Sequence, residues 1–159
     1  MRQTTINIMQ FEELSDRAKE VARQWWRSCA YGDEWWENIY SDAETIGLKI
    51  TGFDTSRSEE ITGEFIDNPE DTAKQILLNH GEECETVTTA QAFLDGGSVD
   101  EDIEEWVFDD QNEEEFLSSL LNGYLVMLRE EELDYFSDEA VDESITINEY
   151  EFTEDGSIF

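Results

Sequence analysis

The single histidine and one of the two cysteines lie four residues apart and are the first candidates for chemistry. His80 and Cys84 could share one face of a helix, but Gly81 lies between them. A cysteine nucleophile also needs a group that orients its base and donors for the oxyanion, and the neighbouring sequence identifies neither. We therefore expect His80 at the end of a helix, no catalytic residue, and a protein that is not an enzyme.

The residue pattern supports neither a metal site nor a cofactor site. Two cysteines, Cys29 and Cys84, make neither a disulfide framework nor a zinc site. Paired carboxylates are so frequent that no glycosidase pair stands out. A calcium loop needs acids at positions 1, 3 and 5 and glycine at position 6, and this pattern fails from Asp95, Asp100, Asp102, Asp109 and Asp155. We predict no metal and no cofactor.

Net charge is the most unusual property of the chain. Its 159 residues include 42 Asp or Glu, 9 Lys or Arg and one His, a formal net charge of −33. Proteins that bind nucleic acid use Lys and Arg to displace counterions from phosphates, and an anionic membrane repels a chain of this charge. No apolar run reaches the roughly 18 residues of a membrane span, and the N-terminus lacks a secretory signal. We expect a cytoplasmic protein that binds neither DNA nor membranes.

The charge is concentrated in the second part of a chain that has enough apolar residues to fold. Hydrophobic residues make up 38% of the chain and aromatic residues 12%, more than disordered acidic segments carry. Residues 1–57 hold 7 basic and 10 acidic side chains, whereas residues 58–159 hold 2 basic and 32 acidic ones. Between Lys74 and Arg129 there is no Lys or Arg at all.

The spacing of apolar residues predicts the elements of the first part. Ser15 is the expected N-cap of the first helix, and Gly47 is expected to end the second one in a left-handed conformation. The expected buried face of the first helix is Leu14, Ala18, Val21, Ala22, Trp25 and Cys29. The predicted elements are a strand at 4–9, helices at 16–30 and 33–46, and a hairpin of strands at 48–53 and 59–66.

The residue pattern after residue 66 predicts mainly helices. Asn68-Pro69 is a strong helix start, with an Asn cap and Pro at the first position. Phe116, Leu120, Tyr124 and Leu128 repeat at helical spacing. The predicted elements are helices from 69 to near Gly81, at 86–95 and at 112–135, an acidic irregular segment at 97–112, and a strand at 144–152.

These elements mix helices and strands without a regular βα alternation. An α+β fold follows, in which helices cover a small antiparallel sheet of about four strands. With no repeat and no Gly, Ser or Pro linker, we predict a single domain over residues 1–159. A weak boundary near 67–68 is the alternative, between a more neutral N-terminal part and a strongly acidic C-terminal part.

Two tryptophan pairs and a basic stripe mark the first two helices. Because adjacent helix residues sit about 100° apart, one Trp of each pair can be buried and its neighbour lie at the rim. The favoured interpretation packs Trp25-Trp26 and Trp35-Trp36 between the two helices; the alternative leaves Trp26 or Trp35 exposed as an interface anchor. Lys19, Arg23 and Arg27 recur every four residues, and they could serve a homodimer contact or neutralise the protein's own acids.

Three explanations compete for the acidity. Solubility needs a net charge of only about 2–8 in a small domain, and −33 goes far beyond that at a cost in stability. Adaptation to salt should load the whole surface, but the acids crowd into one part, and Glu outnumbers Asp 27 to 15. The third is mimicry of nucleic acid: the net −30 of residues 58–159 equals the charge on about 50 Å of duplex DNA.

Mimicry is the favoured interpretation, and the candidate partner-binding residues lie where acids are uninterrupted by bases. They are Asp95, Asp100, Glu101, Asp102, Glu104, Glu105, Asp109, Asp110, Glu113, Glu114 and Glu115. The predicted partner is a basic DNA-binding protein or nuclease complex.

Two segments resemble small phage and prophage proteins of uncertain function. They are residues 11–54, through Phe11, Leu14, Ala18-Lys19, Trp25-Trp26 and Glu34-Trp35-Trp36, and the tail from Tyr135 to Phe152, which ends Asn148-Glu149-Tyr150-Glu151-Phe152. By composition and size the chain is also similar to phage anti-restriction DNA mimics and acidic anti-CRISPR proteins. This resemblance implies a non-enzymatic inhibitor, often dimeric, in the host cytoplasm, which occupies the DNA-binding groove of a restriction enzyme or CRISPR effector complex. It transfers no site residue.

An antitoxin-like acidic protein is the alternative function. Such a protein neutralises one cognate basic partner, whereas a DNA mimic competes with DNA for several unrelated DNA-binding proteins.

Overall fold

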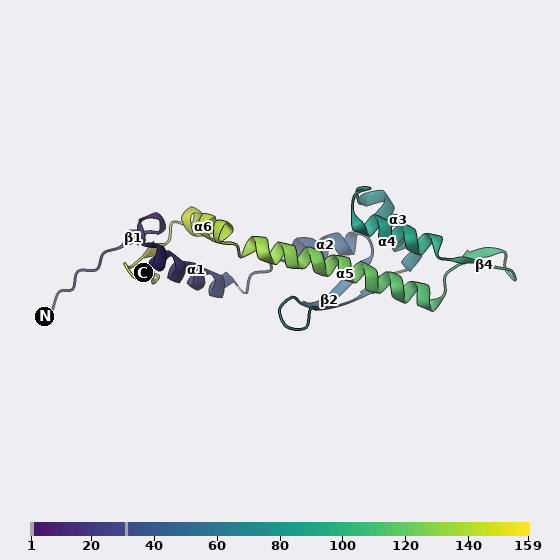
Figure 1. The fold of residues 1–159 in the computed structure, drawn as a ribbon, viewed down its shortest axis with the longest axis horizontal. Coiled ribbons are helices and arrows are strands. Elements are labelled where there is room, and N and C mark those ends of the chain that lie inside the picture. Colours follow the sequence, from purple (N-terminus) through teal and green to yellow (C-terminus); the bar gives the residue numbers. More distant parts are fainter. Residues whose placement is uncertain (1, 31) are drawn as a thin grey trace. The chain divides into compact units, whose positions relative to one another are not determined.

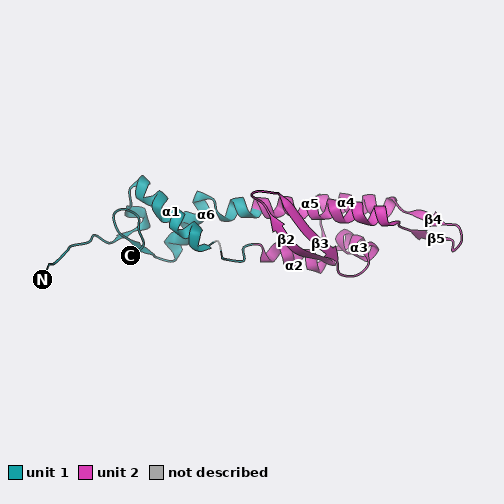
Figure 2. Ribbon diagram, turned by 90° about the horizontal axis from the view of Figure 1, so that it is seen from below, with its two compact units in different colours: residues 1–35, 131–159 teal, residues 36–130 magenta. Residues whose placement is uncertain are grey.

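The computed structural model describes residues 2–30 and 32–159 (Figure 1). The chain divides into two compact units (Figure 2), one made of residues 1–35 and 131–159 and the other of residues 36–130. The first unit, unit 1, is thus built from both ends of the chain, and unit 2 from its middle. Among the described residues, no helix is both long and apolar enough to cross a lipid bilayer.

Unit 1 is a small helical body closed by a short β ladder. Its elements are β1 (Met9–Gln10), the 3₁₀ helix η1 (Phe11–Glu13), α1 (Asp16–Ala30), the end of α5 (Asp110–Tyr135), α6 (Asp138–Ile147) and β6 (Glu151–Phe152). The Ser15 hydroxyl accepts a hydrogen bond from the Ala18 N–H at 3.2 Å, which confirms Ser15 as the cap of α1. The core of unit 1 is formed by Phe11, Leu14, Ala18, Ala22, Trp26, Ala30, Val141, Ile145 and Phe152.

The buried face of α1 is rotated from the predicted one. Residues four apart, Ala18, Ala22, Trp26 and Ala30, are buried, whereas Val21 and Cys29 are exposed. Three alanines on this face let α1 approach its neighbours closely, and one large ring fills the remaining space. The predicted face was right for Leu14, Ala18 and Ala22 and wrong for Val21 and Cys29, because burial continues along Trp26 and Ala30 instead.

The two arginines of the basic stripe on α1 pair within the chain. Arg23 Nε donates to Asp142 Oδ1 at 2.7 Å and Arg23 Nη2 donates to Asp142 Oδ2 at 2.9 Å, a bidentate pair with α6. Arg27 Nη2 donates to Asp138 Oδ1, and Arg27 Nε donates to the carbonyl of Phe136. The hydrogen bond and charge of Asp142 raise the pKa of the Arg23 guanidinium. These arginines neutralise the protein's own acids, the second of the two roles considered for them.

Two predicted strands are largely absent from unit 1. Of the segment 4–9 only Met9 is in a strand, and β1 (Met9–Gln10) pairs antiparallel with Phe152 and Glu151. The segment 144–152 begins as helix: α6 ends at Ile147, and only Glu151–Phe152 is extended. The β-branched run Ile145-Thr146-Ile147 suggested a strand, but Ser137 caps the helix and Val141 and Ile145 share its buried face.

Unit 2 follows the predicted order more closely. Its elements are α2 (Glu37–Thr45), β2 (Leu48–Asp54), β3 (Glu60–Phe65), α3 (Pro69–Asn79), α4 (Glu85–Asp95), β4 (Ser98–Asp100), β5 (Glu105–Val107) and most of α5. The β2–β3 hairpin is antiparallel, Asn68 caps α3 by accepting from the Glu70 N–H, and Gly47 follows α2 with φ of 89°. The α2 helix starts at Glu37 rather than at 33.

Helices and one hairpin enclose the core of unit 2. Buried side chains come from α2, β2, α3, α4 and α5, and Tyr124 of α5 is fully buried among them. As predicted, Phe116, Leu120, Tyr124 and Leu128 lie on the buried face of α5. Aromatic rings interlock here: the ring centroids of Phe93 and Phe116 lie 4.4 Å apart.

The α+β class is confirmed, but the predicted sheet of about four strands is not. In the described part of the chain the strands form three separate two-stranded ladders, β1–β6, β2–β3 and β4–β5. The units meet in sequence at 35/36 and 130/131, and the alternative boundary near 67–68 falls inside unit 2. The single domain stays a prediction.

The tryptophan pairs are packed, though not as one cluster between α1 and α2. Trp26 is buried against Tyr135 and Phe136, and Trp25 packs edge-on to Tyr150 and Phe152. Trp35 contacts Phe136 in unit 1, whereas Trp36 contacts Phe53 in unit 2. None of the four is an exposed anchor, since Trp26 is buried and the others are half-buried.

Gly156 provides a test of the packing in unit 1. It has φ of 89°, and a Cβ at this position would lie 2.1 Å from the Ala18 carbonyl oxygen. We expect Gly156→Ala to lower the free energy of unfolding by more than the roughly 1–2 kcal/mol of a left-handed alanine, measured by thermal or urea unfolding. The matched control is Gly123→Ala in α5, where a Cβ meets nothing within 4 Å. It should raise stability by up to about 1 kcal/mol; equal effects of the two variants would contradict the packing.

Candidate functional site

The eleven predicted partner-binding carboxylates come together on three consecutive elements of unit 2. Asp95 ends α4, five residues from Asp100 to Glu105 lie in the β4–β5 hairpin, and the five from Asp109 to Glu115 surround the start of α5. Nine of the eleven side chains are exposed, and Asp100 and Glu113 are half-buried. Figures 1 and 2 show the hairpin projecting beyond the end of α4 and the start of α5. We call this set the acidic face.

The hairpin within this face corrects the prediction of an irregular segment at 97–112. The pairs Ser98–Val107, Val99–Trp106 and Asp100–Glu105 are antiparallel partners. The turn between the strands has no Gly or Asn, the residues that usually reveal a tight hairpin. Glu104 takes the left-handed position instead, with φ of 55°, so no turn is recognisable from the residue types.

Two carboxylates repel each other across the β4–β5 hairpin. Asp100 and Glu105 are direct cross-strand partners, and like charges placed opposite each other destabilise a β ladder. The Asp100 carboxylate is held by the Asp102 N–H, which donates to Oδ1 at 3.0 Å. Within residues 2–30 and 32–159, no Lys or Arg forms an ion pair with any carboxylate of the acidic face.

One acid at the start of α5 caps the helix. The Asn112 N–H donates to Asp109 Oδ1 at 2.7 Å, and the Asp109 N–H donates to Asn112 Oδ1 at 3.3 Å, a reciprocal cap. Asp110 and Glu113 lie in the first turn, where the helix dipole favours negative charge. Asp109 is therefore a capping residue first, and Asp110, Glu113 and Glu114 are better candidates for partner contact.

The acidic face can accept charge-assisted hydrogen bonds from Lys and Arg. In the part of the chain that the structure describes, no three His, Cys, Asp or Glu side chains gather in a group that could hold a metal ion. Among the described residues these mostly exposed carboxylates have no ion pair to Lys or Arg, and so they form a surface for cationic side chains.

His80 lies in a different polar network of unit 2. It caps the C-terminus of α3, as predicted. Its Nδ1 lies 2.5 Å from Thr86 Oγ1, and its Nε2 lies 3.4 Å from Asp42 Oδ2. The same Asp42 oxygen accepts from the buried Tyr124 hydroxyl at 2.8 Å. Both nitrogens of His80 thus face groups that join α2, α3 and α4, while Cys84 stands exposed before α4.

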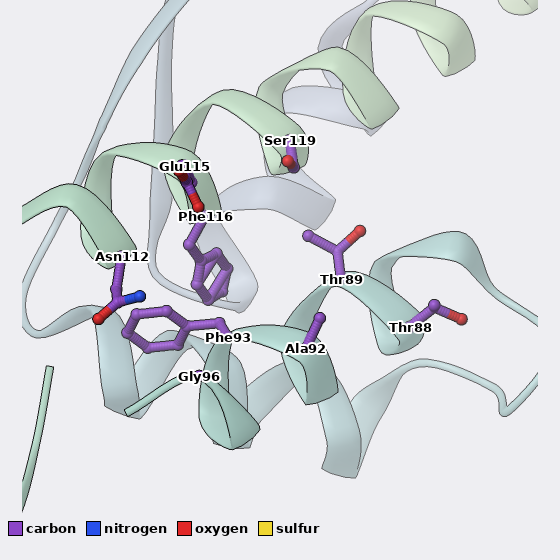
Figure 3. A pocket seen from close by; sticks show the side chains of 9 residues that line it. All are labelled: Thr88, Thr89, Ala92, Phe93, Gly96, Asn112, Glu115, Phe116 and Ser119. Atoms are coloured by element: carbon purple, nitrogen blue, oxygen red, sulfur yellow. The ribbon is translucent and has the colours of Figure 1, made fainter. Parts of the chain in front are cut away.

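A groove of about 360 Å³ runs between α4 and α5 (Figure 3). Phe93 and Phe116 line it together with small and polar side chains, including Thr88, Thr89 and Ser119. Glu115 of the acidic face is its one charged lining residue. A single carboxylate gives no acid–base pair, so the groove adds no catalytic arrangement to the acidic face.

Tyr124 supplies a test of the polar network. Burial, followed by the hydrogen bond to Asp42, raises the pKa of its phenol well above the usual value. The folded state keeps this proton when the unfolded state loses it near pH 10. The resulting stability is complete below pH 10 and is lost as the pH rises above it. We expect the melting temperature of Tyr124→Phe to fall less between pH 9 and pH 11 than that of the wild type; equal falls would exclude this role.

Variants at Asp109 and Glu114 distinguish the effect of helix capping on stability from the effect of surface charge. Asp109→Ala should lower the free energy of unfolding by about 1 kcal/mol, because it removes an N-cap. Asp109→Asn keeps the acceptor and should retain most of that stability. Glu114→Ala removes an exposed charge next to Asp110 and should leave stability unchanged or slightly higher. Urea unfolding of the three variants measures this, and a loss in Glu114→Ala as large as in Asp109→Ala would refute the assignment.

Comparison with known proteins adds no relative from which a site could be transferred. No family model, no curated protein and no solved structure matches this chain. The candidate site therefore rests on the geometry and charge of its own residues.

Proposed function

We propose that this protein is a non-enzymatic inhibitor that presents DNA-like negative charge and occupies the DNA-binding groove of a host defence protein. A restriction enzyme or a CRISPR effector complex is the class of target that the resemblance implies. The observation that carries the proposal is the acidic face itself: eleven carboxylates between Asp95 and Glu115 without an ion pair to Lys or Arg among the described residues.

The distribution of cations supports this choice of surface. Unit 2 holds 25 acidic and 4 basic residues, a net charge of −21, and unit 1 holds 17 and 5, a net charge of −12. In unit 1, Arg23 and Arg27 are in internal ion pairs. In unit 2, Lys74 pairs with Glu70 and Arg129 pairs with Glu59. These four cations are thus paired away from the acidic face, whose charge is left for a partner.

The amount of charge is sufficient for a DNA-binding groove. Duplex DNA carries one charge per roughly 1.7 Å of its axis, so eleven carboxylates match about 19 Å of duplex, or between five and six base pairs. On the first turns of α5, acids three or four residues apart lie about 6 Å from one another. Lys and Arg side chains that bind phosphates can bind carboxylates of this density by the same charge-assisted hydrogen bonds.

The proposal requires that the protein compete with DNA rather than bind it. Carboxylates repel phosphates, and the segment from 75 to 128 has no Lys or Arg that could contact a DNA backbone. A mimic should displace duplex from several unrelated DNA-binding proteins. An antitoxin-like protein, the alternative, should act on one cognate partner and leave the others unaffected.

The decisive variant reverses three charges of the acidic face. Glu101, Glu105 and Glu114 are exposed and have no capping role. We expect the triple variant Glu101→Lys, Glu105→Lys, Glu114→Lys to need at least tenfold more protein to displace DNA, because like charges in an interface cost several kcal/mol. The measurement is displacement of a fluorescent duplex from a type I restriction enzyme, a CRISPR effector complex and a nucleoid protein, each assayed separately.

The matched control makes the same change in charge elsewhere. Glu34→Lys, Glu37→Lys, Glu44→Lys reverses three exposed acids outside the acidic face and leaves Asp33 and Asp42, which accept hydrogen bonds from Tyr135 and Tyr124, intact. It should lose less than threefold. Equal losses in the two variants would mean that the charge acts non-specifically, and a wild type that displaces DNA from none of the three targets would overturn the proposed function.

A further inference from the structure

The acidic face also presents apolar side chains. On the β4–β5 hairpin, Val99 is 58% exposed, Ile103 is 55% exposed and Trp106 is 49% exposed. Val99 and Trp106 are cross-strand partners, so their side chains project from the same face of the hairpin. Ile103 lies in the turn between the strands. Charge mimicry alone does not account for three large apolar side chains among five carboxylates.

Trp106 is fixed in place rather than loosely exposed. Its Nε1 donates to the carbonyl of Leu94 at the end of α4, at 3.2 Å. Gly97 lies directly against the indole, since a Cβ there would be 2.8 Å from Cε2 of the ring. One part of the ring is thus held by the backbone that enters the hairpin, and the rest stays open beside Val99. Rigid, half-exposed Trp side chains are the type of residue that anchors protein interfaces.

The other face and the tip of the hairpin are acidic. Asp100 and Glu105 point away from Val99 and Trp106, because side chains alternate between the faces of a strand. Glu101, Asp102 and Glu104 occupy the turn with Ile103. An isolated two-stranded hairpin is only marginally stable, and the opposed Asp100 and Glu105 weaken it further. Cationic groups between these two carboxylates would relieve the repulsion.

Charge decides which partner can cover the apolar side chains. A second copy of this chain would bring five more carboxylates against the five of the hairpin, and an anionic membrane would be repelled in the same way. A positively charged protein surface is attracted from a distance and can pair with the carboxylates once in contact.

We propose that the β4–β5 hairpin is the anchor with which this protein docks on a positively charged protein surface. Val99, Ile103 and Trp106 enter an apolar depression of the partner. Its Lys and Arg side chains pair with the surrounding carboxylates of Asp100, Glu101, Asp102, Glu104 and Glu105. This inference rests on the proposed function in taking the acidic face as the contact surface, and it adds that the target's groove must contain an apolar depression among its cations.

The two contributions to binding differ in their response to salt. Pairs between exposed charges weaken as the Debye length falls from about 8 Å at physiological ionic strength to about 3 Å at 1 M. Burial of apolar side chains does not weaken in this way. A hairpin that docks as proposed therefore keeps part of its affinity at a salt concentration that abolishes purely ionic binding.

The experiment uses the full-length, ¹⁵N-labelled protein and two synthetic peptides of equal charge and length. One peptide alternates Lys with Leu and the other alternates Lys with Ser. We expect the Lys–Leu peptide to bind at least fivefold more tightly at 0.1 M NaCl and to remain bound at 0.5 M. Its largest chemical-shift changes should fall on the Trp106 indole N–H and on the backbone amides of residues 99–106.

Variants test whether the apolar side chains carry this preference. The double variant Val99→Thr, Ile103→Thr keeps β-branched side chains in the hairpin, and a retained Trp106 indole shift will show that the hairpin is folded. It should lose the preference for the Lys–Leu peptide. The matched control Leu78→Thr, Val126→Thr changes two exposed apolar residues of unit 2 on α3 and α5 and should keep it. Equal binding of both peptides to the wild type, or a preference that survives in the hairpin variant, overturns the inference.

Failure of the inference and failure of the proposed function give different results. If the wild type displaces DNA from its targets but shows no preference for the Lys–Leu peptide, the apolar anchor is wrong and the DNA mimicry stands. If the preference is present and depends on Val99 and Ile103 while no DNA is displaced, the hairpin docks on a basic protein of another kind and the proposed function is wrong.

Discussion

Repulsion among 42 carboxylates acts on every element of this fold, and the positions of the few cations follow from it. Arg23 and Arg27 hold α6 against α1, and Arg129 pairs with Glu59 beside the β2–β3 hairpin. Each of these pairs joins segments that lie far apart in the sequence, where repulsion would otherwise separate them. Three of the nine Lys and Arg residues are thus used for long-range closure.

Neutral donors satisfy many of the carboxylates that have no cation. The Tyr124 and Tyr135 hydroxyls donate to Asp42 and Asp33, and backbone N–H groups donate to Asp54, Asp100 and Asp109. The N–H groups of Ser56 and Arg57 lower the pKa of Asp54, which shows that such donors stabilise a charged carboxylate as a cation does. Much of the acidic composition is therefore compatible with an ordered backbone, because the acids serve as turn and cap residues.

The fold could be predicted from the sequence where local chemistry determines it. The Asn68-Pro69 start of α3, the Ser15 cap of α1, Gly47 after α2 and the regular apolar spacing of α5 are local signals, and the structure confirms them. The elements that were wrong depend on tertiary contacts. The Ile145-Thr146-Ile147 run is helical because Val141 and Ile145 pack in the core of unit 1. The separation into three ladders depends on pairings between segments as distant as β1 and β6.

The acidic face, too, could be predicted from the sequence only in part. Its carboxylates were found from the sequence because a stretch without Lys or Arg is visible in one dimension. The hairpin that carries them was missed because its turn places Glu104 where Gly or Asn is usual. The exposure of Trp106 could not be predicted from the sequence, since it depends on the indole resting against Gly97 and the Leu94 carbonyl. No spacing rule reveals such a contact.

The discontinuous composition of unit 1 has a consequence for biosynthesis. Its first segment leaves the ribosome before the 95 residues of unit 2, and the strand and helix that complete its core come last. Synthesis proceeds at about 5–20 residues per second. The N-terminal part of this core (Phe11, Ala22 and Trp26) therefore stays unburied for roughly 5–20 s, until Val141, Ile145 and Phe152 have been made. During this interval the nascent chain exposes an apolar helix face while the negative charge of unit 2 accumulates behind it. That charge keeps neighbouring nascent chains apart, so the same acidity that burdens the finished fold protects the unfinished one from aggregation.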